Sequence, residues 1–119
     1  MTKVWAVLLA FLAAGAMAQD EPDNAGSVTV REGFLKGEEF ARMSNSDKAG
    51  YAMGFVDALL VAPLLDAPSA GVDRLGRCVV GMSNKRVVTI FNKYLEKHPD
   101  LKQQSANVLL FQALDQACP

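Results

Sequence analysis

The two cysteines and the only histidine are the residues of this 119-residue chain best suited to chemistry. A cysteine thiol beside a histidine imidazole can act as a nucleophile with its base, and four cysteine or histidine side chains together can bind zinc. His98, however, stands before Pro99 at the predicted end of a helix, where a cation caps free carbonyl groups. In an exported protein, Cys78 and Cys118 most simply form one disulfide. The alternative is two free, reactive thiols; if the disulfide forms, neither a zinc cluster nor a Cys–His pair remains.

The carboxylates give no clear catalytic pair. Glu38 and Glu39 are adjacent, so on a helix they point in different directions and suit its positive N-terminal end. Asp57 lies among apolar residues, where it is either a buried acid or, as we expect, a structural group that reaches an edge or an arginine. The chain has neither a glycine-rich phosphate loop nor a Ser-x-x-Lys arrangement. We therefore expect no enzyme, no metal and no cofactor, unless the fold assembles a pair from Asp57, Glu96 or Asp115.

Residues 1–18 have the pattern of a secretory signal peptide. Lys3 supplies the positive charge, an apolar run covers 4–14, and small residues precede the expected cleavage between Ala18 and Gln19. The apolar run is shorter than the roughly 20 residues that span a bilayer, which argues against a membrane anchor. We therefore expect a soluble periplasmic protein with no membrane segment after cleavage.

Size and charge limit the classes of function. A mature chain of about 100 residues forms one domain with a modest core. The chain has 12 basic and 13 acidic side chains and no clustered basic face, which argues against nucleic acid as a partner but not against a protein. A disulfide closing residues 78–118 would add roughly 4 kcal/mol. This is a large part of the about 5–15 kcal/mol that stabilises a small domain.

Hydrophobic spacing predicts an all-α fold, a small bundle of four main helices plus one short helix, held by one disulfide. Within residues 19–33 the first part is polar and acidic, and the second part has no clear secondary-structure pattern. We therefore expect a flexible polar arm followed by an extended lead-in. Residues 34–119 form a single helical domain. No pair of segments reads convincingly as paired strands.

The first half of the domain combines the short helix with a long one. Residues 37–43 form the short helix, with Phe40 turned inward, and Ser44 opens the long helix through a capping motif. Gly50 and Gly54 each cost this helix about 1 kcal/mol relative to alanine, which predicts close contact with a neighbouring helix there. The predicted inward face of the long helix carries Tyr51, Phe55, Ala58, Leu59 and Ala62.

The second half predicts a third helix over 70–82, which carries Cys78, and then two more helices separated by a short break at Pro99. Because the break is short, these last two helices fold back as an antiparallel hairpin. The predicted apolar face of the first carries Val87, Ile90, Phe91, Tyr94 and Leu95. On the second, one side carries Leu101, Ser105, Val108, Leu109 and Gln112, with Leu110, Leu114 and Ala117 beside it.

Two segments are candidates for binding a protein partner. Lys85 and Arg86 fall in the first turn of a helix, where cations oppose the dipole, and such violations point to function. Both charges could instead interact favourably with the negative C-terminal end of the preceding helix. The loop after Pro63, which contains Leu64 and Asp66, is unusually apolar. It is either an exposed contact patch or a segment whose leucines close the core.

Three segments of the chain resemble the Rap/Tai immunity proteins of type VI secretion. They are YAMGFVDALL at 51–60, VVTIFNKYLEKHP at 87–99 and ANVLLFQALDQACP at 106–119, with Cys78 between the first two. The order and spacing of KYLxxHP and ALxxACP carry the likeness. The resemblance implies a small helical, disulfide-bonded periplasmic protein, often a homodimer. It also implies binding to a peptidoglycan-cleaving amidase effector, whose active site the protein occludes so that kin cells are not lysed.

Residues 34–59 are similar, more weakly, to acid-stress chaperones of the HdeA type, which are also small, helical, periplasmic and single-disulfide proteins. Such chaperones release sticky surface when acid protonates their carboxylates. The sequence therefore leaves hypotheses of different classes. One is a protein that neutralises a specific effector, another is an acid-activated chaperone, and a third is a non-enzymatic periplasmic protein with another partner.

Overall fold

The computed structural model describes residues 29–66 and 69–119. The predicted signal peptide, its cleavage site at Ala18 and Gln19 and the first part of the polar arm lie outside these residues. Within the described ranges the chain is helical and has no strand, which confirms the all-α prediction. The elements are α1 (Gly37–Arg42), α2 (Asn45–Val61), the 3-10 helix η1 (Ala62–Leu65), α3 (Ser69–Val79), α4 (Asn84–Lys97), the 3-10 helix η2 (Pro99–Leu101) and α5 (Ala106–Ala117).

Local capping signals set the starts of two helices. The Ser44 hydroxyl accepts a hydrogen bond from the Asp47 amide at 3.1 Å, and the Ser83 hydroxyl accepts one from the Arg86 amide at 3.1 Å. Each hydroxyl satisfies an amide that lacks a partner in the first turn of its helix. Between α3 and α4, Gly81 has a φ of 89°, which suits glycine because it has no Cβ. The cap predicted at Ser44 is confirmed.

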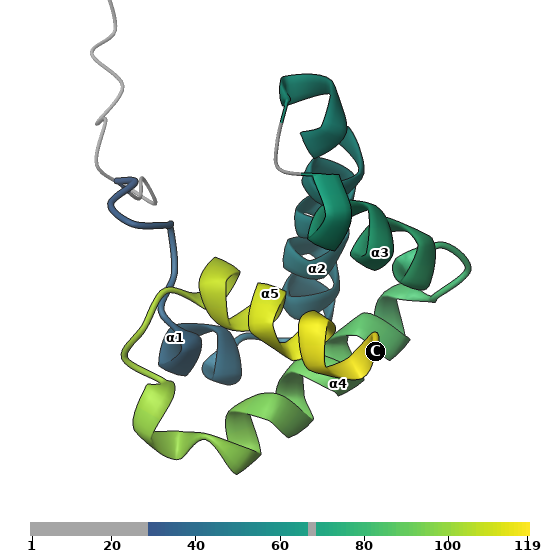
Figure 1. Ribbon diagram of the computed structural model, residues 1–119. Helices are drawn as coiled ribbons and strands as arrows, with labels where there is room; N and C mark the ends of the chain where they lie inside the picture. The colour runs from purple at the N-terminus through teal and green to yellow at the C-terminus, as the bar shows by residue number, and fades with distance from the viewer. Residues whose placement is uncertain (1–28, 67–68) are drawn as a thin grey trace, which may run out of the picture.

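The helices α4 and α5 form the predicted antiparallel hairpin, in which α5 returns across α4 (Figure 1). The Tyr94 hydroxyl joins them by donating to Gln112 Oε1 at 2.9 Å. The helix α1 packs against one end of the hairpin, where the Ala106 amide donates to the Leu35 carbonyl at 2.8 Å. From this base α2 projects outward, and η1 and α3 fold back along it (Figure 1). We call the end of α2, η1 and α3 together the arm.

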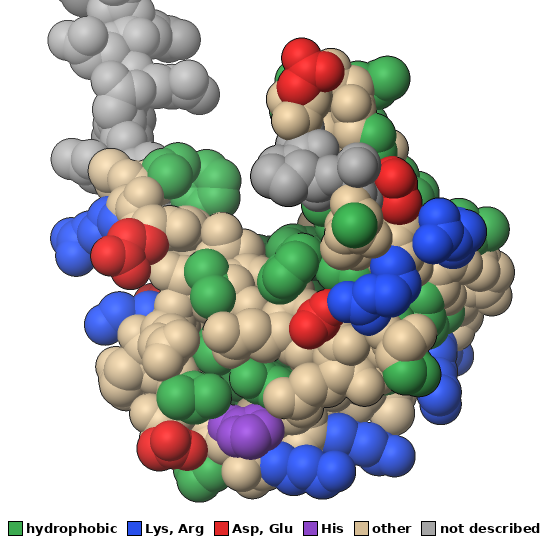
Figure 2. Space-filling view, viewed as in Figure 1, with side chains coloured by type: hydrophobic (Ala, Val, Ile, Leu, Met, Phe, Trp, Pro, Cys, Tyr) green, Lys and Arg blue, Asp and Glu red, His purple; other side chains and the backbone are tan. Residues whose placement is uncertain are grey.

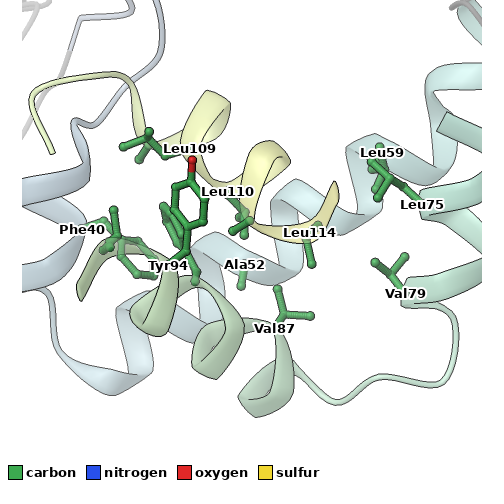
Figure 3. Packing of buried hydrophobic residues seen from close by; sticks show 14 of the residues in the cluster. Phe40, Ala52, Leu59, Leu75, Val79, Val87, Tyr94, Leu109, Leu110 and Leu114 are labelled. Atoms are coloured by element: carbon green, nitrogen blue, oxygen red, sulfur yellow. The ribbon is translucent and has the colours of Figure 1, made fainter. Parts of the chain in front are cut away.

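The buried side chains form one elongated cluster that runs from α1 to the arm. At one end the Phe40 ring lies 4.5 Å from the Phe91 ring, centroid to centroid. At the other end Leu59, Leu75 and Val79 belong to the arm (Figure 3). The members, with Phe40 inward as predicted, are Phe40, Ala52, Leu59, Leu75, Val79, Val87, Phe91, Tyr94, Leu95, Ala106, Leu109, Leu110, Ala113, Leu114 and Cys118.

Cys78 and Cys118 are joined by a disulfide, with their Cα atoms 5.9 Å apart. The bridge connects the last turn of α3 to the residue after α5, so it ties the arm to the end of the hairpin. The prediction of one disulfide is confirmed, and the alternative of two free thiols is wrong.

Most residues predicted to face inward do so, among them Leu59 and Leu109, but a few of them are exposed. Gly50 and Gly54 are exposed, with open space around each, so the predicted close helix contact is wrong. Ala58 is also exposed, and on α5 Val108 is 45% exposed while Ala113 is buried. Both helices are apolar on more than one side, so periodicity alone does not decide which side meets a neighbour. The contacts of α2 with α4 and α3, and of α5 with α4 and α1, decide it.

The helical segment Asn45–Leu65 is long and apolar enough to cross a membrane, with a mean hydropathy of 1.4. Core helices of soluble proteins meet the same criteria, so one such segment is weak evidence for a membrane span. Only 17% of the segment is buried. This low burial means that α2 and η1 present apolar surface to solvent.

Candidate protein-binding surface

The tip of the arm, residues 62–66, is a strongly exposed apolar turn. Pro63 cannot donate the hydrogen bond that would continue α2, and the chain tightens there into η1. The side chains of Leu64 and Leu65 are 82% and 77% exposed, so they do not close the core. Asp66 follows with a φ of 53°, a left-handed conformation uncommon outside glycine. Figure 2 shows hydrophobic side chains beside an acidic one at this end of the molecule.

A shallow, mostly apolar groove of about 240 Å³ runs along the arm between α2 and α3. Leu60 and Val80 line it and are exposed, while Asp73 and Arg77 supply its charges. Together with the tip, the groove gives the arm apolar surface at its end and along one flank. Such surface in a soluble protein marks a site of contact with another molecule.

Lys85 and Arg86 are exposed in the first turn of α4, as predicted. Among the described residues, neither side chain forms an ion pair or a hydrogen bond, so neither caps the C-terminus of α3. Their role in binding a partner stays a prediction. The structure does not bring them together with Leu64 and Asp66, because the two pairs lie at opposite ends of α3. An 11-residue helix spans about 16 Å.

The carboxylates near α1 have structural partners. Glu39 Oε2 accepts a hydrogen bond from the Lys36 amide at 2.7 Å, which closes the first turn of α1. Glu38 Oε2 accepts one from Gln103 Nε2 at 2.6 Å. These two residues help to line a hollow of about 630 Å³ between α1 and the lead-in. Each carboxylate thus has its own structural partner, and no hydrogen bond joins the two.

The other candidates for chemistry are also separate. Asp57 is exposed rather than buried, and Asp115 pairs with an arginine of α3. Within the described part of the chain, no three His, Cys, Asp or Glu side chains are grouped to hold a metal. His98 ends α4 through its amide, which donates to the Tyr94 carbonyl at 3.0 Å. Its ring lies 4.4 Å from the Tyr94 ring, centroid to centroid, and the two planes are tilted by 40°. His98 lies at the end of the helix as predicted, but the capping hydrogen bond comes from its backbone amide and not from its side chain.

Sequence reasoning missed Arg74, which links α3 to the end of α5. Its Nη1 donates to the Cys118 carbonyl and its Nη2 to Asp115 Oδ1. A signal for this contact was present in the spacing. Arg74 stands four residues before Cys78, and Asp115 stands three before Cys118. Side chains three or four apart share a helix face, so a disulfide between the cysteines brings the opposite charges together.

These observations define a class, a small helical protein with one disulfide and an exposed apolar arm. The chain belongs to the family of Rap1a immunity proteins, whose sequence model matches residues 18–119. The match confirms the resemblance found in residues 51–119 and extends it towards the N-terminus. Proteins of this family are in general not enzymes, and membership implies a protein effector as partner. No curated protein and no solved structure matches the chain.

Proposed function

We propose that this protein is exported to the periplasm, where it binds a peptidoglycan amidase effector of type VI secretion and blocks its active site. Membership of an immunity family supports the binding role. The signal pattern in residues 1–18 supports export, and the Rap/Tai resemblance supports the amidase as target. On this proposal the protein acts by contact and carries out no reaction of its own.

The observation that carries the proposal is the exposure of Leu64 and Leu65 at the tip. Burying a leucine side chain is worth roughly 1.5–3 kcal/mol, so two adjacent leucines can anchor an interface. Enzyme active sites are concave, and a narrow projecting turn can enter such a cleft while a flat helix face cannot. The tip projects from the base of the molecule in this way (Figure 1).

Charged groups would add specificity around this apolar centre. Asp66 extends the tip with a negative charge, and Lys85 and Arg86 offer positive charges at the other end of α3. Charges at the rim of an interface mainly set the association rate and the salt dependence. We therefore assign the larger part of the binding free energy to the tip.

The test measures the affinity of the purified chain for a purified peptidoglycan amidase effector of type VI secretion. Replacing both tip leucines by aspartate (L64D with L65D) should weaken binding by more than about 30-fold. Val108→Asp, an exposed apolar position on α5, is the matched control and should change affinity by less than about threefold. Lys85→Glu with Arg86→Glu should mainly slow association.

Two results would contradict the proposal. If the unaltered chain fails to bind the amidase at micromolar concentration, the proposed target is wrong. If V108D weakens binding as much as the tip variant, the tip is not the contact surface. Sedimentation of the same samples measures whether the chain is the homodimer that the resemblance implies.

The acid-chaperone hypothesis has less support. A protein that opens in acid needs ionised carboxylates that hold its fold together. Among the described residues Asp115 is the only carboxylate in a salt bridge, and no acidic side chain is buried. Suppression of the aggregation of unrelated proteins in acid, but not at neutral pH, would favour this hypothesis over effector binding.

A further inference from the structure

The arm is attached to the rest of the molecule over a narrow base. The helix α3 packs chiefly against α2 and η1, while α2 packs against α4, and α4 against α5. Leu59, Leu75 and Val79 are the arm's contribution to the core, and they lie at one end of the cluster (Figure 3). Apart from this indirect connection through α2, the orientation of α3 relative to the hairpin depends on the few direct links between α3 and the end of α5.

Two such links lie one helical turn apart on the same face of α3. Cys78 forms the disulfide with Cys118, and Arg74 donates one hydrogen bond to the Cys118 carbonyl and another to Asp115. The Cys118 carbonyl is a suitable acceptor because α5 ends at Ala117 and no further helical turn uses it. A disulfide fixes a distance but leaves rotation about its bonds. A second link one turn away restricts that rotation.

The guanidinium group suits this second link. It is planar and rigid, and two of its nitrogen atoms reach two acceptors that are both attached to the end of α5. The Arg74 side chain is 35% exposed and that of Asp115 48%, so solvent screens the ion pair, whereas the hydrogen bond to the Cys118 carbonyl is partly buried and less screened. Arg77, the next arginine of α3, is exposed and has no hydrogen bond or ion pair with the described residues.

We infer that Arg74 is a positioning residue that locks the arm at one angle to the α4–α5 hairpin and so presents the tip to its partner. The lock consists of the guanidinium contacts acting together with the neighbouring disulfide. The consequence for binding rests on the proposed function, whereas the effect on the motion of the arm does not. The effect on the motion of the arm and the effect on binding can therefore be refuted separately.

Hydrogen exchange of the purified, oxidised chain tests the motion. In Arg74→Ala the amides of α3 and η1 should exchange about tenfold faster or more, while those of α1 and α4 keep their rates. Arg77→Ala, the matched control, should exchange as the unaltered chain does. Asp115→Asn removes the charge from the other side of the contact and should give a smaller effect in the same segments. Unchanged exchange in α3, or an equal increase in every helix, would overturn the inference.

A double-mutant cycle with a type VI peptidoglycan amidase effector as the probe tests the consequence for binding. If Arg74 acts only by presenting the tip, Arg74→Ala should weaken binding by about tenfold in the unaltered chain but by less than about twofold when Leu64→Asp is already present. Equal losses in both backgrounds would show that Arg74 acts independently of the tip, which would overturn the inference. The inference would also be overturned if Leu64→Asp lost affinity while Arg74→Ala kept full affinity.

Discussion

At the scale of single residues, Phe40 joins α1 to the rest of the core. Its side chain is 0% exposed, and its ring lies 4.5 Å from Phe91 and 5.6 Å from Tyr51, centroid to centroid. The short helix α1 has no other fully buried large side chain. The stability of α1 in its position therefore depends largely on this one ring.

Replacing Phe40 by alanine should lower the free energy of unfolding by about 3–5 kcal/mol, because it leaves a cavity in a closely packed site. Urea denaturation measures the change. Phe34→Ala is the control, since Phe34 is 56% exposed, and it should change stability by no more than about 0.5 kcal/mol. Equal effects of the two substitutions would mean that α1 is not held by the Phe40 ring.

Tyr51 gives the fold a dependence on alkaline pH. Burial raises the pKa of its phenol above the ordinary value of 10.0, because the charged form is poorly solvated. As the pH rises, the unfolded chain therefore loses this proton before the folded chain does. The contribution of Tyr51 to the free energy of unfolding is lost as the pH rises through 10.0 and above. Below that pH the phenol is neutral in both states and the contribution is complete.

Tyr51→Phe should remove part of the alkaline loss of stability, since phenylalanine has no proton to release. Thermal unfolding followed across this pH range measures it for both proteins. Parallel pH profiles for the unaltered chain and the Tyr51→Phe variant would contradict this account, and titration of tyrosinate absorbance in the folded, unaltered chain checks the direction of the pKa shift.

At the scale of helices, the glycines of α1 and α2 have opposite surroundings. A Cβ added to Gly37 would lie 2.7 Å from Leu109 Cδ1 and 3.2 Å from the Lys102 carbonyl oxygen, in a buried position. A Cβ added to Gly50 would have no atom within 4 Å. The same substitution should therefore change stability in opposite directions at the two sites.

Gly37→Ala should destabilise the protein by about 1–3 kcal/mol through overpacking, because the backbone carbonyl cannot move aside freely. Gly50→Ala should stabilise it by about 0.5–1 kcal/mol, since alanine is the better helix former and nothing crowds it. Unfolding curves of the two variants measure both changes. Destabilisation by Gly50→Ala would contradict this expectation. It would indicate that another helix does contact Gly50 closely, as the sequence predicted.

The helices themselves were predictable because their signals are local. Ser44 and Ser83 hold capping oxygens next to the amides they satisfy, and Pro63 and Pro99 each end an α-helix by their own chemistry. The inward faces were less predictable. Val108 is exposed although it fits an apolar stripe, because the position of α4 selects another side of α5. That choice depends on contacts between segments distant in sequence.

At the scale of the whole molecule, the disulfide connects the arm to the hairpin. Reducing Cys78–Cys118 should lower the melting temperature by more than about 10 °C, given roughly 4 kcal/mol for a loop of this length and about 4–8 °C per kcal/mol for a domain of this size. Thermal unfolding with and without reductant measures the shift. An unchanged melting curve after complete reduction would show that the bridge does not stabilise the fold.

The candidate surface was predictable only in part. Leu64 and Asp66 stood out because an apolar run beside a proline is unusual in a loop, and the structure adds that Leu64 is exposed. The projection of the tip was not predictable, because it results from how α2 and α3 pack on the hairpin. Arg74 was missed for the same reason, since its partners follow it by more than 40 positions.

The proposed function requires this protein to work by contact with one effector. The most direct test titrates the purified chain into a type VI peptidoglycan amidase effector while the hydrolysis of peptidoglycan fragments is measured. Hydrolysis should fall in proportion to added protein and stop near equal concentrations, and the L64D and L65D double variant should fail to inhibit. Full hydrolysis in the presence of excess protein would contradict it.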